Sequence, residues 1–270
     1  IVIYIGCVLL LGIPCMISEF IIGRHAQANT ARAFRRVGGR NPLAYIGYMS
    51  VLTGFLITGY YAVVSGWCLQ YIWASLIGQL RGGDPAFFAN YFAAFSQDPV
   101  KPVFWTFIVL FIAFFVVVHG VRDGIERASK MMMPTLFIIL LIIVGASCLL
   151  PDAYKGIEFL FKPDWNMING DVFLAALGQS AIHIGVIDCV VAILAGLMIF
   201  PAAFSVGVNP DSGPSLIFIT LPNVFQQAFG ALPIVGYIIS LLFYALLSMA
   251  ALTSLISLHE VSTAFFQEEL

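Results

Sequence analysis

The stretch 233–258, PIVGYIISLLFYALLSMAALTSLISL, decides the fold class of this sequence. It contains no aspartate, glutamate, lysine or arginine. About 20 apolar residues are enough for an α-helix to cross the hydrocarbon core of a bilayer, so the stretch predicts a transmembrane helix. It also lacks the short alternating segments that are typical of a membrane β-barrel.

The rest of the chain has the same character. Of its 270 residues, 61% are hydrophobic and 10% are charged, and the mean hydropathy is +0.99. Soluble domains carry about 25% charged residues, so this composition excludes both an ordinary soluble domain and a disordered chain. A net charge of −2 gives no basic field that would attract nucleic acid. The five cysteines show no metal-binding spacing and no disulfide framework. The fold class predicted is an all-α membrane protein, a polytopic helical bundle.

Further apolar runs predict the other membrane segments, which lie at 1–22, 43–80, 103–121, 132–150 and 184–207. The run 43–80 is longer than one perpendicular crossing and is expected to tilt or to extend beyond the hydrocarbon. The proline- and glycine-rich stretch 208–232 predicts an external loop with short helices. Both ends of the sequence lie in or just past apolar runs, so we expect a fragment of a longer chain.

The segment 171–207 has an unusual length. Its 37 residues fall short of the roughly 40 that two full crossings and a turn need. The polar break Gly178-Gln179-Ser180 divides it into a half-length helix at 171–179 and a full helix at 184–207. Interrupted helices of this kind mark binding sites in transporters. The alternative is that residues are missing at this point.

Basic residues are concentrated in two loops, 23–42 and 122–131, which hold eight of the 12 lysines and arginines. The positive-inside rule makes both loops cytoplasmic, and the remaining loops, which are acidic, then lie outside. The sequence therefore predicts a multi-pass membrane protein with a defined orientation, and we expect it in the plasma membrane.

Ionisable residues inside predicted spans are costly and point to function. Glu19 is interpreted either as a functional carboxylate or as a buried one that accepts hydrogen bonds from the backbone of a neighbouring helix. Asp188 lies among aliphatic residues and is interpreted as a cation ligand or as an interfacial carboxylate at the cytoplasmic mouth.

Three residues of the last span share one helix face, because Thr253 and Ser254 follow Ala250 by three and four positions. Two hydroxyls and a carbonyl supply neutral oxygens that suit an alkali cation. The alternative is that the hydroxyls donate hydrogen bonds to carbonyls of their own helix or to a neighbouring helix. Tyr61, in mid-span, is a candidate for binding a substrate carboxylate or a helix carbonyl. No protease, esterase or nucleotide-binding motif is present, so we do not expect an enzyme.

Several strings together resemble the neurotransmitter:sodium symporter family, especially its bacterial sodium-dependent amino-acid transporters with the leucine-transporter fold. The matching strings are GIP at 12–14, EFIIGR at 19–24, YY at 60–61, GW at 66–67, GIER at 124–127, MP at 133–134, AALGQ at 175–179, the run 188–201, TLPNVF at 220–225 and AALTS at 250–254. The resemblance covers family helices two to eight. The family's first helix, the second half of its sixth and the helices after its eighth have no counterpart.

The resemblance implies a role for each matched residue. Ala250, Thr253 and Ser254 match the family's second sodium site, and Asp188 matches a ligand of its first. In the family, the residues that match Tyr61, Ser254 and Leu258 face the substrate. Glu19 matches a glutamate that braces broken backbone, and Gln179 matches a glutamine beside the break in the sixth helix.

The function that these matches imply is a sodium-coupled symporter of an amino acid or related small amine in the lipid bilayer, with chloride as a further ion that the family allows. Two alternatives remain open. One is a membrane fragment that binds or scaffolds without transporting. The other is a proton-coupled transporter of the same fold, with Asp188 as the proton carrier.

Overall fold

The computed structural model describes residues 2–38, 44–80, 85–119, 122–162, 170, 186–210, 213, 215–229 and 232–269. These residues form helices and irregular segments, with no strand among them. In chain order the helices are α1 (Val2–Cys7), the π-helix η1 (Val8–Gly12), α2 (Ile13–Ala26), α3 (Thr30–Gly38), α4 (Ala44–Leu76), α5 (Pro85–Ser96), α6 (Lys101–His119), α7 (Arg122–Cys148), α8 (Ala153–Phe161), α10 (Val186–Val206), α11 (Ser215–Phe229) and α12 (Pro233–Glu269).

Four described helical segments are long and apolar enough to cross a membrane, and they are Tyr4–Ala26, Tyr45–Leu76, Lys101–Val118 and Ile234–Glu269. A fifth crossing is formed if Met133–Cys148 is counted together with Ala153–Phe161, which is bent away from it by 114°. These segments overlap the apolar runs in the sequence. The helix α12, however, continues past residue 258 to Glu269. The predicted half-helix 171–179 lies outside the described residues.

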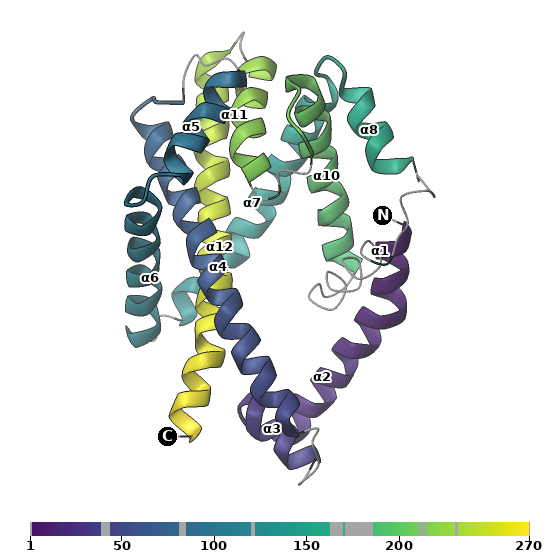
Figure 1. Ribbon diagram of the computed structural model, residues 1–270, viewed down its shortest axis with the longest axis vertical. Coiled ribbons are helices and arrows are strands. Elements are labelled where there is room, and N and C mark those ends of the chain that lie inside the picture. The colour runs from purple at the N-terminus through teal and green to yellow at the C-terminus, as the bar shows by residue number, and fades with distance from the viewer. Residues whose placement is uncertain are drawn as a thin grey trace.

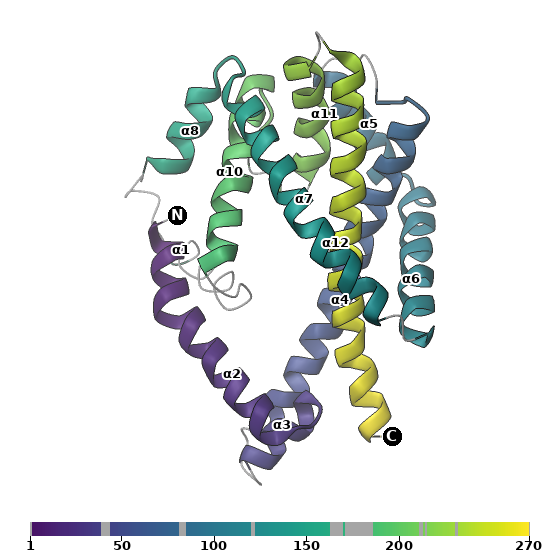
Figure 2. The ribbon, with the colours of Figure 1, turned by 180° about the vertical axis from the view of Figure 1, so that it is seen from behind.

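The two longest helices, α4 and α12, pack side by side through much of their length and form the centre of the molecule (Figure 1). At 33 and 37 residues, they extend about 50 Å or more, which exceeds the thickness of the hydrocarbon core. The helices α5, α8 and α11 gather at one end of the molecule, and α3 and the C-terminus lie at the other (Figures 1 and 2).

The first three helices, α1, η1 and α2, form an arm that stands apart from this centre (Figure 2). Among the described helices outside the arm, α3 is the one with which α2 makes substantial contact. The chain reverses between them at Gln27, whose φ of 45° lies in the left-handed region. The helix α3 in turn packs against α4.

The core is aromatic and lies where α4, α5, α11 and α12 meet. Tyr71 of α4, Phe218 of α11 and Tyr244 of α12 are fully buried or nearly so. The Tyr71 ring centroid lies 4.8 Å from that of Phe218 and 5.3 Å from that of Tyr244. Rings at these separations add about 0.5–1.5 kcal/mol per pair beyond their buried area. This cluster fixes α11 and α5 against the two central helices.

The start of α6 is fixed by Asp98. One oxygen of its carboxylate accepts hydrogen bonds from the backbone N–H groups of Lys101, at 3.0 Å, and Val100, at 2.9 Å. These bonds, together with the Lys101 ammonium, lower the pKa of the Asp98 carboxyl to about 2. A carboxylate here satisfies N–H groups that the first turn of a helix otherwise leaves without partners.

Candidate functional site

The middle of α12 has two different faces. Leu252 and Leu255 are buried and form one cluster with Ala62 of α4 and with Val109 and Ala113 of α6. Each residue of a helix turns by about 100°, so Ala250, Thr253 and Ser254 project from the side opposite to these leucines. Accordingly, Ala250 and Thr253 are half-buried and Ser254 is exposed. The three predicted ligand residues therefore share a face that points away from the α4 and α6 contacts.

The oxygens on this face lie close together. The Thr253 hydroxyl donates a hydrogen bond to the Ala250 carbonyl at 2.9 Å. One turn further on, the Ser257 hydroxyl donates to the Thr253 carbonyl at 3.1 Å. The Ser254 hydroxyl has no hydrogen-bond partner within the part of the chain that the structure describes. The face thus offers one free hydroxyl, and one hydroxyl and one carbonyl held 2.9 Å apart.

The hydrogen bond between the Thr253 hydroxyl and the Ala250 carbonyl has two chemical interpretations. A threonine hydroxyl that donates its proton to a carbonyl keeps its lone pairs free to accept, so the Thr253 and Ala250 oxygens can both face a cation. The same bond is also the ordinary way in which a hydroxyl is satisfied within a helix. Hard cations such as Mg²⁺ and Ca²⁺ take about six oxygen ligands or more. Three oxygens therefore make about half of a cation site.

Two further predicted residues lie near this face. Leu258 follows Ser254 by one turn and is half-buried. Tyr61 is on α4 directly before Ala62, which packs against Leu252 and Leu255, so the tyrosine lies at the level where α4 passes α12. Its side chain is 39% exposed, and its ring meets the Tyr60 ring edge-on with the centroids 6.4 Å apart. An exposed phenol is available to a ligand.

The remaining predicted residues are not brought to the α12 face by the described structure. Glu19 is exposed on α2, within the separate arm, and makes no hydrogen bond to another described residue. The buried, backbone-bonded carboxylate that we considered for Glu19 stays a prediction, because among the described helices α2 makes substantial contact with η1 and α3 alone. Asp188 is in the first turn of α10. Gln179 lies outside the described residues.

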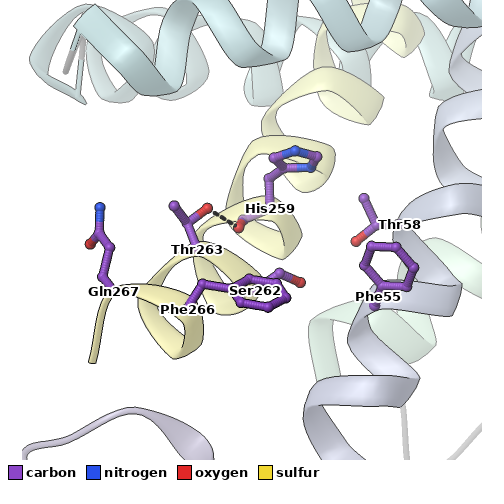
Figure 3. Close-up of a pocket in the computed structure, with 7 residues that line it drawn as sticks. All are labelled: Phe55, Thr58, His259, Ser262, Thr263, Phe266 and Gln267. Carbon is purple, nitrogen blue, oxygen red and sulfur yellow. Dashed lines mark hydrogen bonds between the residues drawn. The ribbon is translucent and has the colours of Figure 1, made fainter. Parts of the chain in front are cut away.

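A cavity of about 350 Å³ lies between α4 and the later part of α12, and it was not predicted from the sequence (Figure 3). Its lining residues are Phe55, Thr58, His259, Ser262, Thr263, Phe266 and Gln267. Two buried atoms in this lining, His259 Nδ1 and Ser262 Oγ, have no hydrogen-bond partner among the described residues.

The cavity lies on the opposite side of α12 from Ser254. His259, Ser262 and Phe266 continue the three-and-four spacing of Leu252 and Leu255, and this spacing marks the seam with α4. The cavity is thus indicated in the sequence by polar residues, His259 and Ser262, at seam positions where apolar residues would be expected. The cavity is separate from the candidate cation face.

Comparisons with known proteins identify the family. The model of the sodium:neurotransmitter symporter family matches residues 1–87 and 86–181. The uncharacterized sodium-dependent transporter YhdH of Bacillus subtilis is 34% identical over 290 residues, which cover 97% of this chain and 63% of that protein. The sodium-dependent serotonin transporter of Drosophila melanogaster is 21% identical over 292 residues, covering 82% of this chain and 46% of that protein.

Among solved structures, the crystal structure of MhsT in complex with L-phenylalanine matches with a TM-score of 0.89 and 34% identity, covering 99% of this chain and 66% of MhsT. The chain therefore spans less than two thirds of the length of YhdH and just under two thirds of MhsT.

The alignment with YhdH also reveals an internal difference. It extends over 290 residues, whereas this chain has 270 in all, so YhdH has residues inside the aligned region that have no counterpart here. The alignment with a sodium-dependent transporter of Haemophilus influenzae extends over 299 residues at 32% identity, covering 97% of this chain and 64% of that protein.

The matched proteins are transporters, not enzymes, and the helical fold expected from the sequence is confirmed. The chain is a multi-pass membrane protein, and it belongs to the sodium:neurotransmitter symporter family.

Proposed function

We propose that this chain provides the central part of a sodium-coupled symporter that carries an amino acid or a related small amine. The observation that carries the proposal is the α12 face, where the Ala250 carbonyl, the Thr253 hydroxyl and the Ser254 hydroxyl turn away from the packed core. The family name and the sodium-dependent relatives support sodium as the coupling ion. The phenylalanine bound to MhsT supports an amino acid as the substrate.

In this proposal the residues have the following roles. The oxygens of Ala250, Thr253 and Ser254 bind one sodium ion, and the Asp188 carboxylate binds a second. The Tyr61 hydroxyl donates to the substrate carboxylate, while Ser254 and Leu258 line the substrate pocket. Glu19, on the α2 arm, and Gln179 support broken backbone in the complete transporter.

The driving force would come from the membrane potential. Each positive charge that crosses the membrane contributes about 2.3 kcal/mol per 100 mV. Entry of two sodium ions at 100 mV would therefore supply about 4.6 kcal/mol, enough to concentrate a neutral substrate roughly a thousandfold.

A second candidate, a membrane protein that binds ligands without transporting them, is favoured by the internal difference from YhdH. The family's broken sixth helix and the loop after it lie near position 180, where the sequence has its length anomaly. A protein without that segment would retain the α12 oxygens but lose part of the substrate pocket.

Uptake into proteoliposomes tests both candidates. We expect the protein expressed from the complete reading frame that encodes this chain to accumulate a labelled amino acid when a sodium gradient is imposed. The 270-residue chain alone is expected to show no accumulation. Uptake that follows a proton gradient and ignores sodium would contradict the proposal and favour Asp188 as a proton carrier. Absence of any uptake by the complete protein would favour the non-transporting candidate.

We further propose that this is a plasma-membrane protein in which the loops 23–42 and 122–131 are cytoplasmic. A cysteine introduced at Ser212, in a background without native cysteines, should react with an impermeant maleimide added to intact cells. A cysteine at Arg35 should react only after the cells are permeabilised. The reverse labelling pattern would refute this orientation.

A further inference from the structure

The short helix α3 lies at the surface level of the membrane. The crossing segment before it ends at Ala26, and the next one begins at Tyr45. Because α3 connects the adjacent ends of two crossing helices, it lies at their common end, beside the C-terminus of α12 (Figure 1). The ends of crossing helices are where side chains meet the headgroup layer.

The structure holds α3 firmly in this position. The Asn29 backbone N–H and side-chain amide donate to one carboxylate oxygen of Glu268, at 3.1 and 2.9 Å. The Arg32 guanidinium forms an ion pair with Glu269 at 2.8 Å. On its other side, α3 meets α4 at Gly47, where an added Cβ would lie 2.8 Å from the Ala31 Cα atom. Contacts with α12 and with α4 therefore hold α3 from two sides.

The charges that the segment from α2 to α4 itself carries on this surface are positive, and the carboxylates beside it are Glu268 and Glu269 at the end of α12. The sequence has no aspartate or glutamate between Glu19 and Asp84. Arg32, Arg35 and Arg36 share one face of α3, because they are spaced by three and four positions. Arg32 is engaged by the α12 end, and Arg36 donates to the Ala26 carbonyl.

Two arginines at this level are left without such contacts. Arg24, in the last turn of α2, and Arg35, on α3, are both exposed. Neither guanidinium forms an ion pair or hydrogen bond within the described ranges, although the Arg24 carbonyl accepts one from the Gln27 side chain. They are positive charges that an external anion can reach.

Exposed apolar residues flank these arginines in the sequence. Phe20 and Ile21 are each 63% exposed on α2, Val37 is 53% exposed at the end of α3, and Tyr45 is 71% exposed at the start of α4. Exposed apolar and aromatic residues at the end of a crossing helix contact the acyl chains and the headgroup layer. A soluble anion would contact the arginines and not these apolar side chains, whereas a phospholipid can contact the arginines with its headgroup and the apolar side chains with its acyl chains.

We propose that Arg24 and Arg35, together with this apolar rim, bind the headgroup phosphate of an anionic phospholipid. Arginine suits this role because its planar guanidinium donates two parallel hydrogen bonds to phosphate oxygens. The acyl chains of the same lipid would lie along Phe20 and Ile21. The site is distinct from the sodium and substrate residues proposed above.

Spin-labelled lipids provide a direct test. The protein is reconstituted in phosphatidylcholine, and the motionally restricted fraction of labelled phosphatidylglycerol is compared with that of labelled phosphatidylcholine by electron paramagnetic resonance. We expect a preference for phosphatidylglycerol that falls by about fivefold for each arginine removed. This factor corresponds to about 1 kcal/mol for a basic residue near an anionic membrane surface. The variants are Arg24→Gln, Arg35→Gln and the double variant.

The matched control is Lys101→Gln, which removes one exposed positive charge at the start of α6. The Lys101→Gln variant should leave the preference for phosphatidylglycerol unchanged. The Arg35→Lys variant keeps the charge and should retain most of this preference. Excess soluble glycerol phosphate should not displace the lipid. An unchanged preference in the double variant, an equal loss in the Lys101 variant, or full displacement by glycerol phosphate would each overturn the proposal. The experiment needs neither sodium nor substrate, so its outcome is independent of the transport assay.

Discussion

Replacing Gly156 by alanine should separate α8 from α10 and lower the thermal stability of the protein substantially. A Cβ at this position would lie 2.4 Å from the Pro201 backbone nitrogen, and 2.5 and 2.6 Å from the Phe200 carbonyl carbon and oxygen. Backbone atoms of a packed helix cannot move aside as a flexible side chain can. Overpacking of this kind costs about 1–3 kcal/mol or more. Thermal unfolding of the variant in detergent would measure this loss of stability.

Gly145 of α7 provides the control for this variant. Apart from its own helix, a Cβ there meets no atom of the described residues within 4 Å, so Gly145→Ala should be neutral or stabilise the helix by up to about 1 kcal/mol. The contact between the Phe159 and Phe200 rings, with centroids 5.1 Å apart, should be lost together with the close approach at Gly156. If the two alanine variants melted at the same temperature, the packing of α8 on α10 described here would be incorrect.

The double variant Thr253→Val with Ser254→Ala should raise the sodium concentration needed for half-maximal uptake by roughly tenfold or more. Both changes remove hydroxyl ligands and nearly preserve volume, and the loss of one polar ligand in a dry site costs about 1–3 kcal/mol. Because sodium and substrate binding are linked, the apparent substrate affinity should fall as well. The measurement is sodium-dependent uptake by the protein from the complete reading frame.

Ser257→Ala is the matched control for this experiment. Ser257 is on the same helix, one turn further on, and its hydroxyl donates to the Thr253 carbonyl. Since it is outside the proposed sodium site, its removal should leave sodium dependence close to wild type. A double variant with unaltered sodium dependence would identify Thr253 and Ser254 as groups that only satisfy helix carbonyls.

The helices themselves were predictable because a bilayer offers no partner for backbone polar groups, so each long apolar run must satisfy its own N–H and C=O groups. The end of α12 was not. Hydrophobicity falls after residue 258, where His259 and Glu260 follow, and the predicted span stops there. The helix continues to Glu269 because the end of an apolar run marks the end of the hydrocarbon, not the end of the helix.

The candidate site was predictable only in part, for a similar reason. Helical spacing is enough to bring Ala250, Thr253 and Ser254 to one face, since all three are on one rigid element. The position of Glu19 depends instead on how the α2 arm packs, and no local pattern encodes this. The cavity beside His259 likewise depends on how two helices separated by more than 150 residues meet.

Among the described helices outside the α1–α2 arm, α3 is the one that holds it by substantial contact, and this has a mechanical consequence. With 25 residues rising about 1.5 Å each, the arm is a lever of roughly 37 Å whose pivot is the turn at Gln27. A rotation of only about 10° at that pivot would carry its far end through roughly 6 Å, while α3 stays fixed to α4 and α12. A small angular change at the turn would thus displace the far end of the arm by about the width of a side chain. A torque applied at that far end would be resisted by the contacts that Asn29 and Arg32 make with Glu268 and Glu269.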